Sequence, residues 1–311
     1  MADAPARRPG FGLTIPTGAE SVRGILLILI AYLVVTGADV AVKWVLPEVG
    51  VALAMLVRGV VGAAAVAIIV RGRGLMPKNR RLLAQRSVLH CCVSASWYWA
   101  WARSMPLADS YAIACAAPLL MTVLAIPMLG EKVGWRRWTS TMLGCTGVLF
   151  MLQPSGDLWR IETPILLIST AIMAITRIWT RVLSATDGPA SVAFWLLAAH
   201  IPMGLLFGTT LFPFPDQVPS ISVMAALLIF GVANAVAHLL FSRAFALAPV
   251  STLAPFEYTP LIWGTVLGFA IWAEVPAWTT LGGAAIVIAA GLYNLHRERV
   301  RRALERRQAA A

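Results

Sequence analysis

The sequence is a succession of apolar stretches, each about as long as a helix that crosses a lipid bilayer. Such a helix needs about 20 mainly apolar residues, and ten stretches of this kind follow one another, separated by short polar, glycine-rich or proline-containing connections. The pattern predicts an all-α integral membrane protein with ten transmembrane helices. The expected spans are residues 22–46, 50–70, 86–104, 108–129, 135–153, 163–183, 190–211, 220–246, 251–272 and 276–295.

Composition supports this class of protein. Of the 311 residues, 59% are hydrophobic and 13% are charged, and the mean hydropathy is +0.79. Soluble domains average about 45–50% apolar and about 25% charged residues. Ten helices use about 210–220 residues at the usual length of a span. The remainder suffices for two polar tails and short loops, so no soluble domain is expected.

The basic residues lie on alternate connections. The formal net charge is +11, and most of the 25 Lys and Arg residues lie in the N-terminal head, in the even-numbered connections or after the tenth span. Because basic residues mark the cytoplasmic side, both termini are expected there, in a multi-pass protein of the bacterial inner membrane. A nucleic-acid partner is not expected, since the charges form no groove or stripe on a solvated surface. The first 20 residues contain no apolar core, so no cleaved signal peptide is expected.

Two stretches about 140 residues apart repeat the same order of features. Each has an arginine that closes a span, a turn with a proline, a helix with a mid-span proline (Pro118, Pro260) and then an acid (Glu131, Glu274). Five spans in each half force the second copy to enter the membrane in the opposite orientation, which predicts an inverted-topology repeat. The expected parts are a cytoplasmic tail (1–21), a first five-helix repeat (22–153), a periplasmic linker (154–162), a second repeat (163–295) and a basic cytoplasmic tail (296–311).

The segments APLLMTVLAIPMLGEKVGW and RAFALAPVSTLAPFEYTPLIWGTVLGFAIWAEVP resemble the duplicated five-helix unit of the drug/metabolite transporter superfamily, the EamA-type ten-helix exporters. The resemblance extends from about residue 22 to 295, and it departs at Ala273, where glycine usually precedes the acid. The chain is also similar to amino acid exporters of the YddG type. The resemblance implies a central cavity lined by helices 1, 3, 4, 6, 8 and 9, in a transporter that is not an enzyme.

Polar groups inside the spans are the first candidates for function, because they are costly in lipid. The third span carries a polar and aromatic stripe at helical spacing, which suits an amphipathic solute with an apolar side chain. The repeat offset places Asn234 over Ser94 and His238 over Tyr98. The alternative is that the aromatic residues form an interfacial belt or fill the bundle. The substrate-binding candidates are Tyr98, Trp101, His90, Ser94, Trp97, Asn234, His238, Thr36, Tyr32, Thr176, Tyr111, Glu257, Tyr258 and Trp263.

Ionisable residues inside the spans form a second group. Asp39 precedes the turn near residues 47–50 by about as many positions as Arg58 follows it, so an ion pair between them is predicted. It would be structural, a gate or part of a proton relay. Arg177 is either an anchor that reaches the membrane surface or the partner of a substrate carboxylate. The residues assigned to a gate or an ion pair are Asp39, Lys43, Arg58, Arg177 and Arg243.

Counting depth along neighbouring spans gives two further pairs, Arg103 with Asp109 and Arg243 with Glu257. Glu257 lies between Pro255 and Pro260, where missing amide donors are expected to break the helix. The sequence leaves open whether Glu257 belongs to a binding site or is a structural lock.

The leading interpretation is a secondary transporter that exports amino acids, aromatic and other neutral ones, and related small amphipathic metabolites by alternating access. The alternative within the superfamily is an exporter of cationic drugs or purine-type metabolites, which would be expected to present an unpaired acid in its cavity. A remote alternative is an intramembrane lipid-modifying enzyme, but no HExxH or GxSxG motif is present. The four cysteines show no metal-ligand spacing. No catalytic residue, metal or cofactor is predicted, and the expected partners are a small-molecule substrate and the lipid bilayer, with a monomer favoured over a homodimer.

Overall fold

A computed structural model of the chain describes residues 17–129, 139, 142–144, 146–147, 149–150, 160–286, 288–290 and 292–293. Within these ranges every regular element is a helix, which confirms the predicted all-α class. Most of the expected fifth span lies outside the described residues, as do Glu131, the acid of the first repeat, and most of both tails. The elements are α1 (Gly18–Ile69), α2 (Arg80–Ala102), α3 (Leu107–Ala114), α4 (Ala117–Leu129), α6 (Glu162–Leu183), α7 (Pro189–Thr210), α8 (Ile221–Leu247), α9 (Val250–Leu253), the 3₁₀ helix η1 (Ala254–Tyr258) and α10 (Thr259–Trp272).

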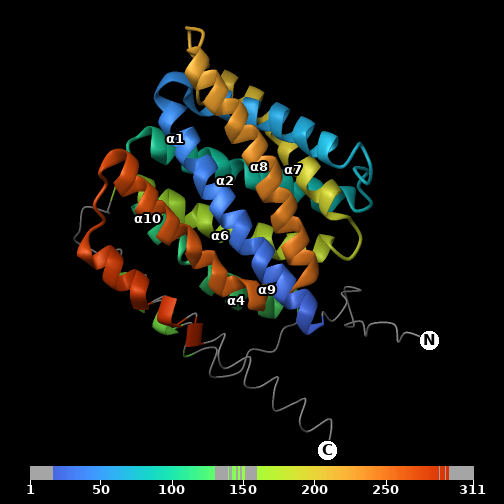
Figure 1. Ribbon diagram of the computed structural model, residues 1–311, viewed down its shortest axis with the longest axis vertical. Coiled ribbons are helices and arrows are strands. Elements are labelled where there is room, and N and C mark those ends of the chain that lie inside the picture. Colours follow the sequence, from blue (N-terminus) through green and yellow to red (C-terminus); the bar gives the residue numbers. More distant parts are fainter. Residues whose placement is uncertain are drawn as a thin grey trace, which may run out of the picture.

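Helix α1 contains two of the expected spans. Its 52 residues would measure about 78 Å if straight, at 1.5 Å per residue, whereas a bilayer core is about 30 Å thick. Gly50 interrupts the helix with φ 68° and ψ 174°, a conformation that strains a residue with a side chain. Together with Pro47, it divides α1 into two segments that match the spans 22–46 and 50–70, and Figure 1 shows the bend between them.

Two later spans are interrupted near prolines. The fourth is divided into α3 and α4 at Cys115 and Ala116, two residues before Pro118. The ninth is divided into α9, η1 and α10, and the 3₁₀ turn lies where the sequence predicts a break around Glu257. Proline lacks the amide donor that continues a helix. These breaks position functional candidates, because Tyr111 lies on α3 and Glu257 lies in η1.

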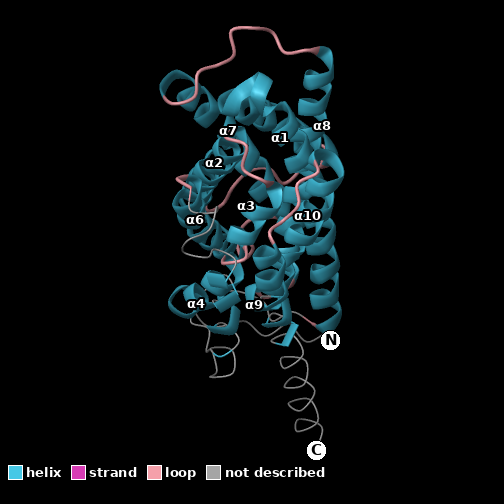
Figure 2. Cartoon of the chain, turned by 90° about the vertical axis from the view of Figure 1, so that its left-hand side faces the viewer, coloured by secondary structure: helices cyan, strands magenta, loops and turns pink. Residues whose placement is uncertain are grey.

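The long helices pack around a common interior. The pair α1 and α8 run side by side, α7 packs on α1, and α2 packs on α6 and α7. Seen from the side in Figure 2, the short helix α3 lies between α6 and α10, and it contacts both of them. The interior between these helices contains the candidate site.

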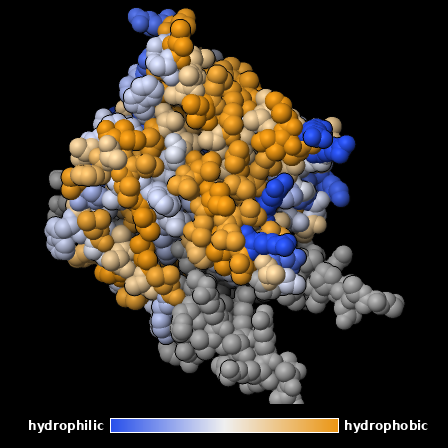
Figure 3. Space-filling view, in the orientation of Figure 1, coloured by the Kyte–Doolittle hydropathy of each residue, from blue (hydrophilic) through white to orange (hydrophobic). Residues whose placement is uncertain are grey.

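The outer surface is apolar, as a membrane protein requires. Four helical segments are long and apolar enough to cross a bilayer by length and composition. Large apolar side chains point outward from several helices, with exposed fractions of 75% for Ile68 and 66% for Ile229. Figure 3 shows that apolar residues cover most of the face formed by α1 and α8. Such a surface marks contact with lipid or protein rather than with water. The four segments are Ala19–Ile69, Glu162–Leu183, Pro189–Thr210 and Ile221–Leu247.

Candidate functional site

A cavity of about 100 Å³ lies among α1, α2, α3, α6, α8, η1 and α10. Its walls come from the spans that the family resemblance implies, the first, third, fourth, sixth, eighth and ninth. They also include the second span, through Arg58. Thirteen of the nineteen residues proposed from the sequence line it: Tyr32, Asp39, Arg58, His90, Ser94, Trp97, Tyr98, Trp101, Tyr111, Arg177, Asn234, His238 and Glu257.

Four of the proposed binding residues lie elsewhere. The Thr36 hydroxyl donates to the Tyr32 carbonyl at 2.8 Å, and the Thr176 hydroxyl donates to the Met173 carbonyl at 2.8 Å. Each of these two hydroxyls therefore donates its proton within its own helix. Tyr258 packs in the apolar core outside the cavity, and Trp263 is 37% exposed on the outer side of α10.

Two of the proposed gate residues, Lys43 and Arg243, also lie outside the cavity lining. Arg243 is exposed at the end of α8. The lining residues that sequence reasoning did not propose are mostly apolar: Val35, Val93, Ala114, Met173, Phe241 and Pro260. Helical spacing contained a signal for some of them, since Val35 lies one turn before Asp39 and Met173 one turn before Arg177.

Arg58 is the centre of a buried hydrogen-bond network. One terminal nitrogen donates to the Ser94 hydroxyl at 2.8 Å and to the Tyr98 hydroxyl at 2.7 Å. The other lies 2.8 Å from Nε2 of His238. A guanidinium can only donate, so Nε2 of His238 accepts and the proton of this ring lies on Nδ1. The contact with Arg58 therefore holds His238 in its neutral form.

His200 joins the same network through Ser94. Its Nδ1 lies 2.9 Å from the Leu196 carbonyl, which can only accept, and its Nε2 lies 3.1 Å from the Ser94 hydroxyl. Nδ1 consequently carries a proton and donates to Leu196, and Nε2 contacts the Ser94 hydroxyl. The His90 ring lies 5.2 Å from that of His238 and 6.2 Å from that of His200. Sequence reasoning treated these histidines as separate and did not propose His200, although a histidine inside an apolar span is itself a functional signal.

Asp39 does not form the expected ion pair with Arg58. Its carboxylate accepts a hydrogen bond of 2.6 Å from the Tyr111 hydroxyl. Among the described residues, no carboxylate oxygen lies within 4.0 Å of the Arg58 guanidinium. The expectation rested on equal depth in the membrane, but Ser94 and Tyr98 of α2 bind Arg58 while Tyr111 of α3 binds Asp39. Both charges nevertheless line the same cavity.

The other two predicted pairs also have different partners in the structure. Arg103 pairs with Glu162, with Nε and Oε1 2.5 Å apart, and not with Asp109. Glu257 pairs with Arg177, whose Nε lies 3.6 Å from its Oε1, and not with Arg243. Arg177 comes from α6, which packs against the broken ninth span. The Arg177 guanidinium also lies 4.3 Å from the centre of the Phe241 ring, a cation–π contact.

Lys43 forms an ion pair that the sequence did not predict. Its ammonium group binds Glu274, the acid that follows the second mid-span proline. Glu274 also accepts a hydrogen bond of 3.1 Å from the Leu107 amide, at the start of α3. The Lys43 ammonium lies 4.7 Å from the centre of the Trp272 ring. Lys43, one turn after Asp39, is thus neutralised by a different carboxylate.

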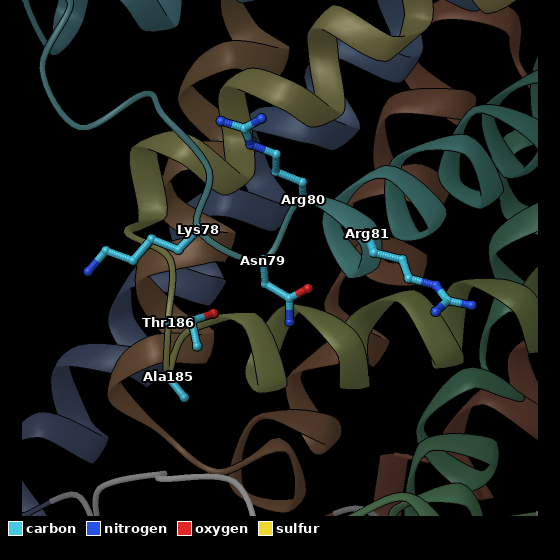
Figure 4. Close-up of a pocket in the computed structure, with 6 residues that line it drawn as sticks. All are labelled: Lys78, Asn79, Arg80, Arg81, Ala185 and Thr186. Carbon is cyan, nitrogen blue, oxygen red and sulfur yellow. The ribbon is translucent and has the colours of Figure 1, made fainter.

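A second, open pocket lies at the start of α2, apart from the central cavity. Its lining is basic (Figure 4), but the Arg80 and Arg81 side chains point in different directions and do not converge on one point. Asp187 closes the base of this region by accepting from the Lys78 amide at 2.7 Å and the Asn79 amide at 3.2 Å. The pocket therefore marks a junction between two connections on a basic face. Its lining residues are Lys78, Asn79, Arg80, Arg81, Ala185 and Thr186.

Comparison with protein families shows that residues 22–153 match the EamA-like transporter family. These limits coincide with those of the first repeat proposed from the sequence. Members of this family are transporters and not enzymes, in agreement with the interpretation of the sequence.

Several relatives are named as transporters or exporters. A riboflavin transporter of Vibrio cholerae is 29% identical over 62% of this chain and 63% of its own length. An S-adenosylmethionine uptake transporter of Rickettsia bellii is 24% identical over 65% of this chain and 68% of its own length. The matches to two riboflavin transporters span less than two thirds of those proteins, at 63% and 64%. A pseudopaline exporter of Pseudomonas aeruginosa is 23% identical over 86% of this chain and 94% of its own length.

The fold also occurs in a solved crystal structure. The two chains superpose with a TM-score of 0.62 at 16% identity, over 88% of this chain and 95% of the other. At this identity the likeness concerns the fold alone.

Proposed function

We propose that the protein, whose residues 22–153 match the EamA-like transporter family, is a secondary transporter that exports small amphipathic metabolites from the cytoplasm. The leading substrates are amino acids, both aromatic and other neutral ones. In this proposal, ten helices form two inverted five-helix repeats, residues 22–153 and 163–295, that alternate access to a site between them. Both termini lie in the cytoplasm of a bacterium, and the protein spans the inner membrane as a monomer.

The central cavity is the observation that carries this proposal. It lies inside the bundle, and its lining comes from both halves of the chain, as expected of a site at the interface of two repeats. One wall is aromatic: the Tyr98 and Trp101 rings stack with centres 6.0 Å apart, and the Trp97 ring meets that of Trp101 edge to face at 5.6 Å. The second half contributes hydrogen-bonding groups, Asn234 and His238. A mixed lining of this kind suits an amphipathic solute.

The relatives support transport of a small molecule without selecting the substrate. Their names cover riboflavin, S-adenosylmethionine and pseudopaline, and both uptake and export. The choice of amino acids therefore rests on the cavity and not on the relatives.

A second candidate function is export of organic cations. It is favoured by Asp39, a partly buried carboxylate in the cavity lining that forms no ion pair within the described residues. Arg58 counts against this candidate, because its fixed positive charge lines the same cavity and repels a cation.

Counterflow in liposomes tests the proposal. Purified protein should accelerate the entry of labelled tryptophan, methionine or threonine into vesicles loaded with the same unlabelled amino acid. Protein-free vesicles provide the background rate. Flux of ethidium without flux of any amino acid would support the cation candidate, and absence of flux with every solute would contradict the transport proposal.

A further inference from the structure

We propose that Arg58 and Asp39 form a dipolar binding site, in which Arg58 binds the carboxylate of a zwitterionic substrate and Asp39 binds its ammonium group. This inference rests on the proposed transport function, and it assigns the two charged groups of the substrate to two residues. The ordinary alternative for two opposite charges in one cavity is that they neutralise each other, and the geometry does not show that pairing.

Arg58 is a buried cation whose partners are neutral. Its exposed fraction is 4%, and its hydrogen bonds go to Ser94, Tyr98 and His238. Its Nε has no hydrogen-bond partner. A buried charge is costly unless a group of opposite charge compensates it. The planar guanidinium is also the side chain best suited to binding a carboxylate through two parallel hydrogen bonds.

The other arginine that lines the cavity already has a carboxylate partner, as does Lys43 one turn after Asp39. Lys43 is paired with Glu274, and Arg177 is paired with Glu257. Within the described part of the chain, Arg58 is thus the cavity-lining cation that lacks an anion within 4.0 Å. The anion that it lacks can come from the substrate.

Asp39 is the complementary group. Its carboxylate accepts a hydrogen bond from the Tyr111 hydroxyl, and the side chain is partly exposed to the cavity. A carboxylate has about four lone-pair sites, so Asp39 has capacity for further donors such as an ammonium group. Lys43, the cation nearest to it along α1, is bound to Glu274 and does not neutralise it.

A ligand with a single charge would be attracted by one of the two residues and repelled by the other. A cation would be attracted by Asp39 and repelled by Arg58, and an anion would meet the reverse, because like charges brought together at a binding site are costly. A zwitterion satisfies both groups. Its apolar side chain can pack on the aromatic wall, since Tyr98, which binds Arg58, stacks on Trp101.

Competition with matched analogues tests this site in the unmodified protein. Labelled tryptophan is exchanged in proteoliposomes against unlabelled tryptophan, tryptamine, which lacks the carboxylate, or indole-3-propionate, which lacks the ammonium group. Each analogue should compete at least about tenfold more weakly than tryptophan, the factor expected from loss of one charged hydrogen bond. Equal competition by either analogue would overturn the assignment of the corresponding charge.

Two variants assign the charges to residues. Arg58→Gln should abolish the preference for tryptophan over tryptamine. Asp39→Asn should abolish the preference for tryptophan over indole-3-propionate. Arg58→Lys, which retains the charge, should retain part of the first preference. The controls Arg81→Gln and Asp216→Asn remove the same charges from exposed positions and should keep both preferences.

The outcome is separable from the transport proposal. If tryptophan exchanges but the variants keep both preferences, the dipolar site is wrong and the transport proposal stands. If no amino acid exchanges, the transport proposal fails first. A variant that yields no folded protein is replaced by the analogue series on the unmodified chain, which tests the same two charges.

Discussion

The two ion pairs near the central cavity differ in what they join. Lys43 and Glu274 connect α1, in the first half of the chain, to the segment that follows α10 in the second. Arg177 and Glu257 both belong to the second half, and aromatic rings surround the Arg177 guanidinium. A pair within one half can persist when the halves move relative to each other, whereas a pair between halves must break or rearrange. Under the proposed alternating access, the first pair is placed to control opening and the second to hold one half together.

Burial adds a second difference. The side chains of Arg177 and Glu257 are 8% and 3% exposed, and those of Lys43 and Glu274 are 7% and 18% exposed. A third pair, Arg103 with Glu162, has an arginine that is 53% exposed. The cost of leaving a charge without its partner rises with burial. Substitution should therefore destabilise the protein most in the pair Arg177–Glu257, less in Lys43–Glu274 and least in Arg103–Glu162.

The largest effect is expected for Glu257→Gln. The change leaves Arg177 buried without its anion, and breaking a buried pair from one side costs about 3–5 kcal/mol. Thermal unfolding in detergent should show this loss. The double variant Arg177→Met/Glu257→Gln should be more stable than Glu257→Gln, because no uncompensated charge remains. If the single and the double variant lose the same stability, the unpaired charge of Arg177 is not the cause of the loss.

Compared with Glu257→Gln, Lys43→Met is expected to destabilise the protein less but to promote opening between the two halves more. Glu274 is partly exposed and keeps the Leu107 amide as a partner, so the loss should be about 1–3 kcal/mol, the cost of an unsatisfied group. Breaking a contact between the halves should raise the rate at which a thiol reagent modifies Cys115, which is buried at the break between α3 and α4.

The control for opening is Glu257→Gln, measured under conditions where both variants are folded. If Cys115 reacts equally fast in the two variants, the distinction between a pair that joins the halves and a pair within one half is wrong.

The helix positions were predictable because they depend on local composition. Apolar runs predicted α6, α7 and α8 to within about two residues at each end. Prolines predicted the break in the ninth span, and the stripe on α2 was correctly assigned to one face, since all five of its residues line the cavity: His90, Ser94, Trp97, Tyr98 and Trp101. These features need only helical periodicity and the missing amide of proline.

The ion partners were not predictable, for a physical reason. Depth counting gives the height of a residue in the membrane, but the partner also depends on how each helix is rotated about its axis and on which helix lies beside it. Asp39 and Arg58 were expected to meet, yet Tyr111 and Tyr98 from two other helices bind them instead. Glu274 lies beside Lys43 because segments distant in the sequence pack together, and local sequence patterns do not predict such packing.

The smallest effect is expected for Arg103→Gln, and it is the reference for the other two pairs. The arginine is 53% exposed, although its partner Glu162 is 3% exposed. Pairs with an exposed member contribute about 0–1 kcal/mol, so thermal unfolding should shift little and the rate of Cys115 modification should stay at that of the unmodified protein. The Arg103 guanidinium also lies 5.2 Å from the centre of the Trp99 ring, so Trp99→Leu in the same background separates a cation–π contribution from that of the ion pair. Arg103→Gln could instead lower the stability as much as Glu257→Gln does. That result would show that burial of one partner is enough to make a pair costly to break. The three pairs would then have to be ranked by the burial of the carboxylate and not by the exposure of the more exposed partner.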